Sequence, residues 1–468
     1  MSTNPLSDRR TQAAHLLRRA GFGGTPAEID QLAALSHADA VEKLLNFQID
    51  GNLAFNLERK LQENGYEPGL NDIAYWWLLL MARTKQPLQE KMTLFWHGHF
   101  TSSFSKVRDP MLLLEQNQLF RDNALANFND LTKKVSRNPA MIDFLDGQSN
   151  RKGAPNENYA RELMELFTIG IGNYTETDVR EAARAFTGWG YKDRAYVFNA
   201  NQHDTGSKTF MGQTGNFNGD DIIDIILKRP ESGQFIVNKL WEFFVYPNPE
   251  ASVTQRLTDV YFKNNYSILE VMRALFNAPE FLSDKAYHAL VKSPVEYVIG
   301  MAKQLGATNI ASNLTNAAAG MGQTLFNPPT VKGWDGNLHW INSSYFFDRI
   351  NTANALSDAR KNGQFRYDPY ELLGFNSSGT TSGATSGAAT QPPDNAGAVV
   401  DRFAGIFLDG EIQPEVKNAL TDYLNSSGAL KASDLTAAAS GKGTAKAVDS
   451  RVRGTLHLIM STPDYMLK

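Results

Sequence analysis

Apolar residues recur at helical spacing along most of this 468-residue chain. The clearest case begins at Asn156, a residue type that suits the N-cap position of a helix. One helical face then repeats at i, i+4, i+7, i+8 and i+11 through Tyr159, Leu163, Leu166, Phe167 and Gly170. This spacing predicts an amphipathic helix over the segment that follows Asn156.

The same periodicity, together with start signals, predicts further helices. Thr25 with Glu28 and Thr175 with Asp178 have the spacing of capping boxes. Apolar faces predict helices over 73–82, 88–95, 111–119, 128–135, 220–227, 235–245, 253–262 and 268–276. Strand patterns are limited to 191–198 and 208–211. The sequence therefore predicts a mainly α-helical protein, a large helical globular domain with a small β-ribbon insertion.

A composition shift divides the chain. Residues 376–397 are rich in Ser, Gly and Thr and contain Pro-Pro, which is typical of a linker or an exposed loop. We expect a main helical domain over 1–375 and a C-terminal helical segment over 398–468 that packs on it. A chain of this length can bury a large core.

Charge and cysteine content exclude several classes of protein. The 46 Lys and Arg against 50 Asp and Glu give a net charge of −4, which offers no basic surface for nucleic acid. No apolar run reaches the roughly 18–20 residues of a membrane span. The N-terminal segment lacks the apolar stretch of a secretory signal. We expect a cytoplasmic protein, or a periplasmic or secreted one if a leader was removed. Zero cysteines exclude disulfides and thiolate ligands.

Several blocks, in order over residues from about 10 to 355, carry a family resemblance. They include HLLRRAGFG at 15–23, EKMTLFWHGHF at 90–100, NENYARELMELF at 156–167, KSPVE at 292–296 and PPTVKGW at 328–334. By these blocks the chain resembles the bacterial family called domain of unknown function 1800. The resemblance implies a mainly helical protein. Family members are often encoded beside a sulfatase-like family, domain of unknown function 1501, which implies a sulfatase-like partner protein or a shared pathway.

His97 and His99 form an H-x-H pair. On an extended segment both side chains point to the same side and can reach one metal ion. A third ligand would come from His203, Asp204 or Glu162, and such nitrogen and oxygen ligands suit one divalent zinc, manganese or iron ion. The structural alternative is that the intervening glycine ends a helix and the histidines make capping or packing contacts.

Carboxylates and arginines gather on two consecutive predicted helices. Glu157 and Glu162, with Glu165 nearby, are candidates for a general base or acid, because a carboxylate near an apolar face has a raised pKa. Arg161 and Arg184 are candidates to clamp an anionic substrate through bidentate contacts. The structural alternative is an interhelical ion-pair network that fixes how the two helices pack.

A polar loop lies between the two predicted strands. His203 and Asp204 are candidate acid/base residues there, and Lys208 is a candidate to hold phosphate, sulfate or carboxylate. Loops held by a rigid scaffold often carry function. A plain turn built on Asp204 and Gly206 would explain the same residues.

An aromatic loop follows the Pro-Pro pair at 328–329. Lys332 and Trp334 are candidate substrate-binding residues, because exposed tryptophans stack on sugar rings. If Trp334 and Trp340 are buried, they only anchor the loop.

The leading functional hypothesis is a hydrolase or transferase, metal-assisted or not, that acts on an anionic or carbohydrate-like substrate. One alternative is a non-catalytic scaffold or assembly factor that works with the sulfatase-like partner. Another is a glycan-binding module without turnover. Familiar signatures of nucleotide binding, zinc proteolysis and serine hydrolysis are absent from the chain.

Overall fold

Local side-chain caps set the helix starts of this protein. In the computed structural model, the Glu28 amide donates to the Thr25 hydroxyl at 3.2 Å and the Thr25 amide donates to the Glu28 carboxylate at 2.7 Å. Thr175 and Asp178 exchange the same pair of bonds. Both predicted capping boxes are confirmed.

The structure describes residues 4–48, 68–359, 364–375, 391–441 and 446–468. The first part of the chain forms α1 (Arg9–Arg19), α2 (Pro26–Ala33), α3 (His37–Leu45), α5 (Leu70–Arg83) and α6 (Pro87–His99). Every residue of α6 except Gly98 is buried. A helix that is buried on all sides belongs to the centre of a fold, so α6 is the helix around which the others pack.

The next part of the chain forms one end of the molecule. Its helices are α7 (Phe104–Val107), α8 (Pro110–Asp122), α9 (Phe128–Ser136), α10 (Pro139–Phe144), α11 (Asn158–Glu162), α12 (Glu176–Ala185) and α13 (Gly219–Leu227). Its strands are β1 (Trp189–Lys192), β2 (Ala195–Phe198), β3 (Lys208–Phe210) and β4 (Gln213–Gly215). We call residues 101–227 the hairpin lobe.

The remaining helices return through the middle to the opposite end. They are α14 (Pro230–Phe244), α15 (Ala251–Lys263), α16 (Ile268–Phe276), α17 (Pro294–Gln304), α18 (Asn313–Gly320), α19 (Ser343–Ser357) and α20 (Pro369–Leu372). The last are α21 (Ala396–Phe407), α22 (Pro414–Leu424), α23 (Ala432–Ala439), α24 (Lys446–Met460) and α25 (Pro463–Met466). The two small sheets and the many helices confirm a mainly α-helical fold with a small β insertion.

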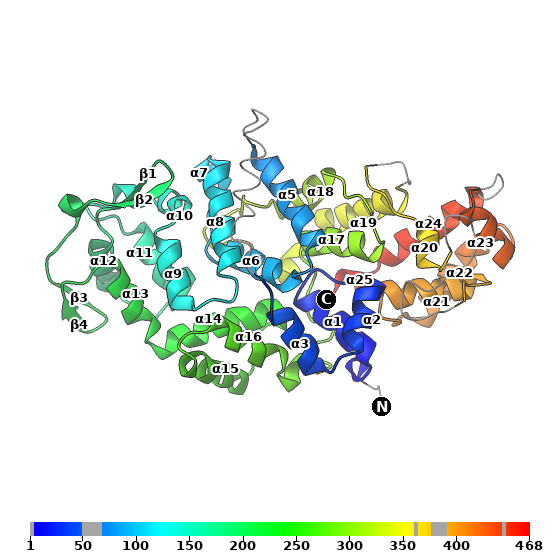
Figure 1. Cartoon of the computed structure of the whole chain (residues 1–468), viewed down its shortest axis with the longest axis horizontal. Helices are drawn as coiled ribbons and strands as arrows, with labels where there is room; N and C mark the ends of the chain where they lie inside the picture. Colours follow the sequence, from blue (N-terminus) through cyan, green and yellow to red (C-terminus); the bar gives the residue numbers. More distant parts are fainter. Residues whose placement is uncertain (1–3, 49–67, 360–363, 376–390, 442–445) are drawn as a thin grey trace.

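Figure 1 shows an elongated molecule with the hairpin lobe at one end and α21–α23 at the other. Helix α24 packs on α19, and α25 brings the chain back to the middle, beside α1. There the Lys292 amide donates to the Met466 carbonyl at 2.8 Å. Of the predicted linker, residues 376–390 lie outside the described residues, and α21 begins at Ala396.

The segment 191–198 is a hairpin and not the single strand that its alternation predicted. Strands β1 and β2 pair antiparallel, with Trp189 opposite Phe198. Asp193 and Arg194 form the turn with φ of 50° and 59°. Type I′ hairpin turns require positive φ at both central positions. The turn carries neither Gly nor Pro, and Asp193 by itself is only a weak signal for the reversal.

The helix behind Asn156 changes pitch halfway along. The Asn158 amide donates to the Asn156 side chain at 3.0 Å, and α11 follows. Residues Leu163–Thr168 continue as a π-helix. The predicted apolar face is buried at Leu163 and Phe167. Because π-helical turns are often found at functional sites, the segment over 163–168 stays a candidate for part of a functional site.

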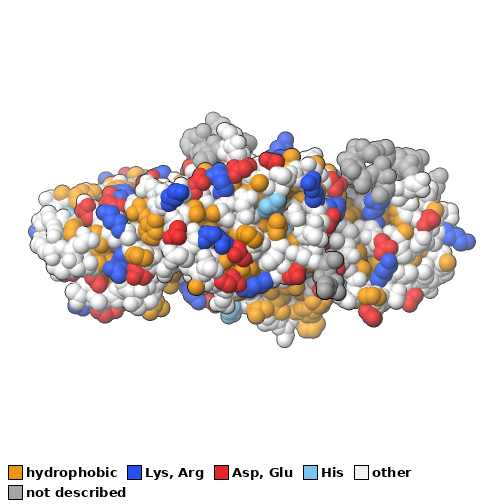
Figure 2. Space-filling model, turned by 90° about the horizontal axis from the view of Figure 1, so that it is seen from below, with side chains coloured by type: hydrophobic (Ala, Val, Ile, Leu, Met, Phe, Trp, Pro, Cys, Tyr) orange, Lys and Arg blue, Asp and Glu red, His pale blue; other side chains and the backbone are white. Residues whose placement is uncertain are grey.

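The surface carries mixed charge over the core. Figure 2 shows Lys and Arg interspersed with Asp and Glu on the face it presents. This distribution agrees with the net charge of −4. Within the described ranges, no helix is both long and apolar enough to cross a lipid bilayer.

Candidate functional site

The H-x-H pair lies on a helix, so the extended segment that we predicted for it is wrong. Helix α6 runs through His99, and residues two apart on an α-helix are separated by roughly 200° around its axis. The His97 Nε2 accepts a hydrogen bond from the Phe326 amide at 3.1 Å. The His99 Nε2 donates to the Phe167 carbonyl at 2.9 Å. The two rings therefore serve different neighbours.

Both histidines are buried and neutral. Burial lowers the pKa of His97 to about 3 and holds the pKa of His99 well below its usual range. In the part of the chain that the structure describes, no three His, Asp or Glu side chains gather as a metal site requires. His97 and His99 therefore have different neighbours, and the zinc, manganese or iron site expected at His97, His99 and His203 stays a prediction.

The carboxylates around Arg161 form surface ion pairs. Arg161 contacts Glu157 at 3.1 Å and Glu176, on the first turn of α12, at 2.7 Å. The Tyr174 hydroxyl donates to Glu165 at 3.0 Å. These contacts join α11, the π-helix and α12, as the interhelical ion-pair interpretation predicts.

Glu162 has the property that proton transfer needs. Burial raises its pKa, and the neighbouring Glu165 adds repulsion while Arg161 opposes the shift. A carboxylate with a raised pKa suits general acid or base chemistry. Glu162 therefore stays a candidate in the hairpin lobe.

The loop of His203, Asp204 and Lys208 is held by its own contacts. Arg184 Nε and the Gly206 amide both donate to the Asp204 carboxylate at 2.8 Å. Lys208 Nζ donates to the carbonyls of Asp204 at 2.7 Å and Gly206 at 3.0 Å. His203 Nδ1 donates to the Thr187 carbonyl at 2.8 Å. A turn built on Asp204 accounts for these bonds, which engage Arg184 and two of the three donors of Lys208 within the protein.

The Lys332-Gly333-Trp334 loop rests on α6 at Gly98. Gly333 has a φ of 86°, and a Cβ there would stand 2.3 Å from the Gly98 carbonyl oxygen, so only glycine fits. The Trp334 ring packs on His97 with centroids 5.5 Å apart. Helix α6 ends at His99, next to Gly98, as the structural alternative for the H-x-H pair expected, and Gly98 also receives this loop. The sequence blocks at 90–100 and 328–334 therefore contact each other in the fold.

A cavity of about 640 Å³ lies beside this contact, between α6, α14, the start of α17 and the loop over 332–340. This volume is within the range of small-molecule sites. Its aromatic lining consists of Phe95, Phe243, Trp334 and the largely buried Trp340. Its charged lining consists of Lys239, Glu242, Glu296, Lys332, Asp335 and Lys468.

The amines of the cavity are in an unusual environment. Burial lowers the pKa of Lys239, Glu242 opposes the shift and Lys332 adds repulsion. The Lys239 ammonium lies 5.1 Å from the centre of the Phe235 ring. Lys332 pairs with Asp335 at 2.8 Å and holds the pKa of that carboxyl below its usual range. Asp335 is therefore ionised at neutral pH.

Two ring nitrogens on the cavity lining have no protein partner. Among the described residues, nothing hydrogen-bonds to His99 Nδ1 or Trp334 Nε1. Since His99 Nε2 donates to Phe167, Nδ1 carries the lone pair of the neutral ring. An unsatisfied buried polar atom costs about 1–3 kcal/mol. Both nitrogens are enclosed by the protein, although their residues are on the cavity lining.

Residues 15–467 match the family model described as Protein of unknown function (DUF1800). The chain belongs to this family. The resemblance inferred from the sequence blocks is confirmed, and the match extends through the C-terminal helices, beyond the core of about 10–355 that we expected. No curated protein and no solved structure matches the chain.

In this DUF1800 protein, the residues that line the cavity come from segments that are far apart in the sequence. Of the predicted residues, Lys332, Trp334 and His99 line it, whereas Glu157, Arg161, Glu162, Arg184, His203, Asp204 and Lys208 do not. Sequence reasoning missed Lys239, Glu242 and Lys468. A lysine in the middle of the apolar run over 235–245 was the available signal for Lys239.

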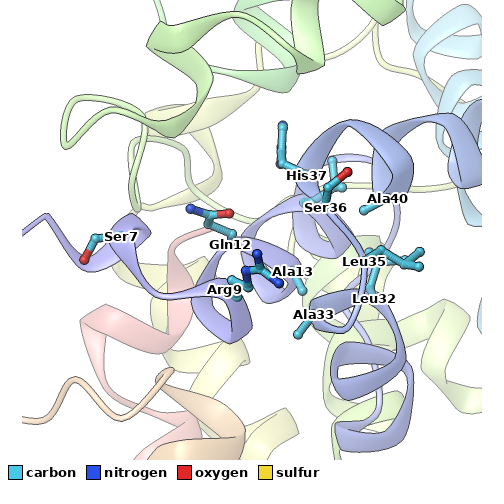
Figure 3. Close-up of a pocket in the computed structure, with 11 residues that line it drawn as sticks. Ser7, Arg9, Gln12, Ala13, Leu32, Ala33, Leu35, Ser36, His37 and Ala40 are labelled. Carbon is cyan, nitrogen blue, oxygen red and sulfur yellow. The ribbon is translucent and has the colours of Figure 1, made fainter.

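A smaller hollow of about 270 Å³ lies between α1, α2 and α3 (Figure 3). Gln12 and His37 are on its lining, but both side chains hydrogen-bond to backbone carbonyls. Gln12 donates to the Leu6 carbonyl at 2.7 Å and His37 to the Phe276 carbonyl at 2.8 Å. This hollow therefore offers less chemistry than the 640 Å³ cavity.

Proposed function

We propose that this protein is an enzyme of the hydrolase or transferase class that acts on an anionic or carbohydrate-like substrate bound in the 640 Å³ cavity. One observation carries the proposal: aromatic side chains and amines line the same cavity, with Trp334 beside Lys332 and Phe243 facing the space that Lys239 also lines. Aromatic faces bind the apolar faces of sugar rings, and ammonium groups bind acidic substituents.

The carboxylates of the cavity provide the reactive groups. Asp335 is ionised because Lys332 lowers its pKa, and an ionised carboxylate is suited to the role of nucleophile or of stabiliser of a developing positive charge. Glu242 lines the same cavity and is the candidate acid. Hydrolysis or transfer at a sugar carbon commonly uses two carboxylates in these roles.

The test measures binding and turnover on one panel of sulfated, uronic-acid and neutral oligosaccharides. Trp334→Ala should weaken binding by about tenfold or more, because it removes a stacking face. Asp335→Asn should retain binding and lower kcat by about 10²–10⁴. Phe198→Ala is the matched control for Trp334→Ala: Phe198 is an aromatic residue, 49% exposed, on β2 in the hairpin lobe. It should change neither quantity.

The other hypotheses are outcomes of the same experiment. Binding that Trp334→Ala removes, with no product formed from any ligand, would replace the enzyme by a glycan-binding module. Absence of binding across the whole panel would favour the scaffold. Turnover that survives both Asp335→Asn and Glu242→Gln would exclude these carboxylates from the chemistry and return attention to Glu162.

Assembly with a sulfatase-like partner protein, of the family called domain of unknown function 1501, is the second candidate. One observation favours it: Leu338, on the lining of the cavity, is 72% exposed, and Phe347, on α19, is 64% exposed. Large apolar side chains that are exposed to solvent are available for contact with a partner protein. Co-purification with the partner that is lost in Leu338→Asp, but kept in Val197→Asp of β2, would support this role.

A further inference from the structure

A cluster of buried cations lies behind the wall that Glu296 and Lys468 form. Its side chains, each at most 8% exposed, are those of Arg18, Arg19, Lys91, Lys292, Arg349 and Lys468. Among the described residues, the carboxylates that act on them are Glu296 and Asp409. Six basic side chains thus face two carboxylates, and burial lowers the pKa of Lys91, Lys292 and Lys468, as expected where buried positive charge is incompletely paired.

Asp409 cannot compensate the rest of the cluster. It accepts from both terminal nitrogens of Arg18, at 2.9 Å and 2.5 Å, in a bidentate pair. In the described part of the chain, Arg19 and Arg349 each keep Nε and Nη1 without a hydrogen-bond partner. The cluster therefore has more donors than the protein satisfies.

The Glu296 carboxylate is also occupied by hydrogen bonds from neighbouring groups. Its carboxylate accepts from Lys91, from Lys468 at 2.5 Å and from the Ser293 amide at 2.7 Å. The two lysines hold the pKa of Glu296 at about 2 despite its burial. Glu296 is fully ionised and already shared, so its charge does not cancel that of the remaining cations.

The cluster meets open space at Lys468. Glu296 and Lys468 line both the 640 Å³ cavity and a hollow of about 10 Å³, which Arg18 and Lys292 line as well. A hollow of that volume holds about one water-sized sphere, so an oxyanion cannot pass through it. Of the basic side chains in the cluster, Lys468 is the one that lines the larger cavity, beside Glu296.

We propose that the ligand of the cavity carries an acidic group, a carboxylate, sulfate or phosphate, that binds the Lys468 ammonium at the cavity floor. This rests on the proposed function, because it takes the cavity as the substrate site. An ammonium has three donors; Glu296 accepts from one of them. The buried cations behind Lys468 add an attractive field, and the aromatic lining contacts the rest of the ligand.

The groups around Lys468 make this binding depend on pH. They are Glu296 on α17, Lys91 on α6 and Arg19 on α1, beside the Phe243 ring of α14. Burial lowers the pKa of Lys468 to about 7, with Glu296 opposing and the two other cations adding to the shift. Because only the ammonium form binds an anion, affinity falls as the pH rises through this value.

Inorganic sulfate is the probe, titrated calorimetrically into the full-length protein at constant ionic strength. We expect one site whose affinity decreases from about pH 6 to about pH 8.5 as Lys468 loses its proton. Lys468→Met should weaken sulfate binding by about tenfold or more. Lys468→Arg keeps the charge and should bind sulfate at both pH values. Lys285→Met, which removes a surface lysine paired with Glu250 at 2.6 Å, is the control and should bind as the natural protein does.

The outcomes separate this inference from the proposed function. Sulfate that competes with an acidic oligosaccharide supports an acidic group of the substrate at Lys468. Sulfate that binds without competing makes a free inorganic anion the ligand and overturns the inference. Equal sulfate affinity in Lys468→Met, or in Lys468→Gln should the first variant not fold, also overturns it. Neutral oligosaccharide binding with no sulfate binding removes the inference and leaves the proposed function in place. Sulfate binding with no oligosaccharide bound would instead remove the proposed function.

Discussion

The hairpin lobe and the cavity wall both concentrate charge, but they balance it differently. In the lobe, Arg161 and Arg184 are 33% and 26% exposed, and each contacts two carboxylates. At the cavity wall, Lys91 and Lys468 are at most 6% exposed and share one carboxylate, Glu296. Each of the two lobe arginines is thus matched by carboxylates, whereas at the wall two buried amines share one carboxylate.

This difference shows what charge density along a sequence can indicate. Arg161 lies 15 residues from its partner Glu176, so the lobe's ion pairs appear as a dense local pattern. At the cavity wall, Lys91 lies 205 residues from its partner Glu296, and Lys468 lies 172 residues from the same glutamate. A dense pattern therefore predicted a local ion-pair network, and the imbalance that favours ligand binding arises only from folding.

The largest expected effect separates the two regions by stability. Glu296→Gln should lower the free energy of unfolding by about 3–5 kcal/mol, because it leaves Lys91 and Lys468 buried beside a neutral group. Glu157→Gln in the lobe should cost at most about 1 kcal/mol, since its pair with Arg161 is partly exposed and screened by solvent. Urea unfolding of both variants measures the comparison.

The stability difference between Glu296→Gln and the natural protein should depend on pH. The pKa of Glu296 is lowered to about 2 in the folded protein, against about 4.3 in an unfolded chain. Its contribution is therefore present above about pH 4.3 and is lost as the pH falls toward 2. The stability gap between Glu296→Gln and the natural protein should close over that interval. Equal costs for the Glu296 and Glu157 variants at neutral pH would show that the two regions do not differ.

A second comparison uses two glycines on opposite sides of one contact. Gly333→Ala should destabilise the protein by about 2–4 kcal/mol, because the φ of 86° is strained for alanine and the new Cβ meets the Gly98 carbonyl oxygen. Gly98→Ala should be neutral or stabilise by up to about 1 kcal/mol, since its Cβ would lie 3.9 Å from Trp334 within a helix. Thermal unfolding of the two variants tests this asymmetry. A costly Gly98→Ala with a harmless Gly333→Ala would contradict the assigned packing of the loop.

Helices were predictable because their signals are local. The predicted helix over 268–276 coincides with α16, and the capping box of Thr175 and Asp178 determines the start of α12. The hairpin at 191–198 was missed because its turn, Asp193 and Arg194, adopts positive φ without the glycine that usually marks such a turn. The π-helix was also missed, since an apolar face does not reveal a change of pitch.

The candidate site was predictable only in fragments. Lys332 and Trp334 were correctly placed together on one aromatic loop, and they line the cavity. The H-x-H motif suggested metal binding because its geometry was taken as extended, whereas the helix turns His97 and His99 to different neighbours. Lys468 carried no signal, because its role depends on α25 returning the chain to the centre of the molecule.

The smallest expected effect tests whether the lobe acts on the cavity at all. Asp204→Asn removes the charge that Arg184 contacts but keeps an acceptor for the Gly206 amide, so it should cost about 1 kcal/mol or less at neutral pH. The pKa of Asp204 is lowered to about 2, chiefly by its bond with Arg184. Its contribution is therefore present above the unfolded value of about 3.9 and lost as the pH falls through 2.

Thermal unfolding from pH 7 down to about pH 2 measures this contribution, and the variant should converge with the natural protein at the acid end. Sulfate titration of the same variant is the decisive companion measurement. Unchanged sulfate affinity is expected, because Asp204 does not line the cavity and its charge is neutralised by Arg184. A clear loss of affinity in Asp204→Asn would mean that the two regions are coupled. The polar loop would then have to be treated as part of the binding site, despite its internal contacts.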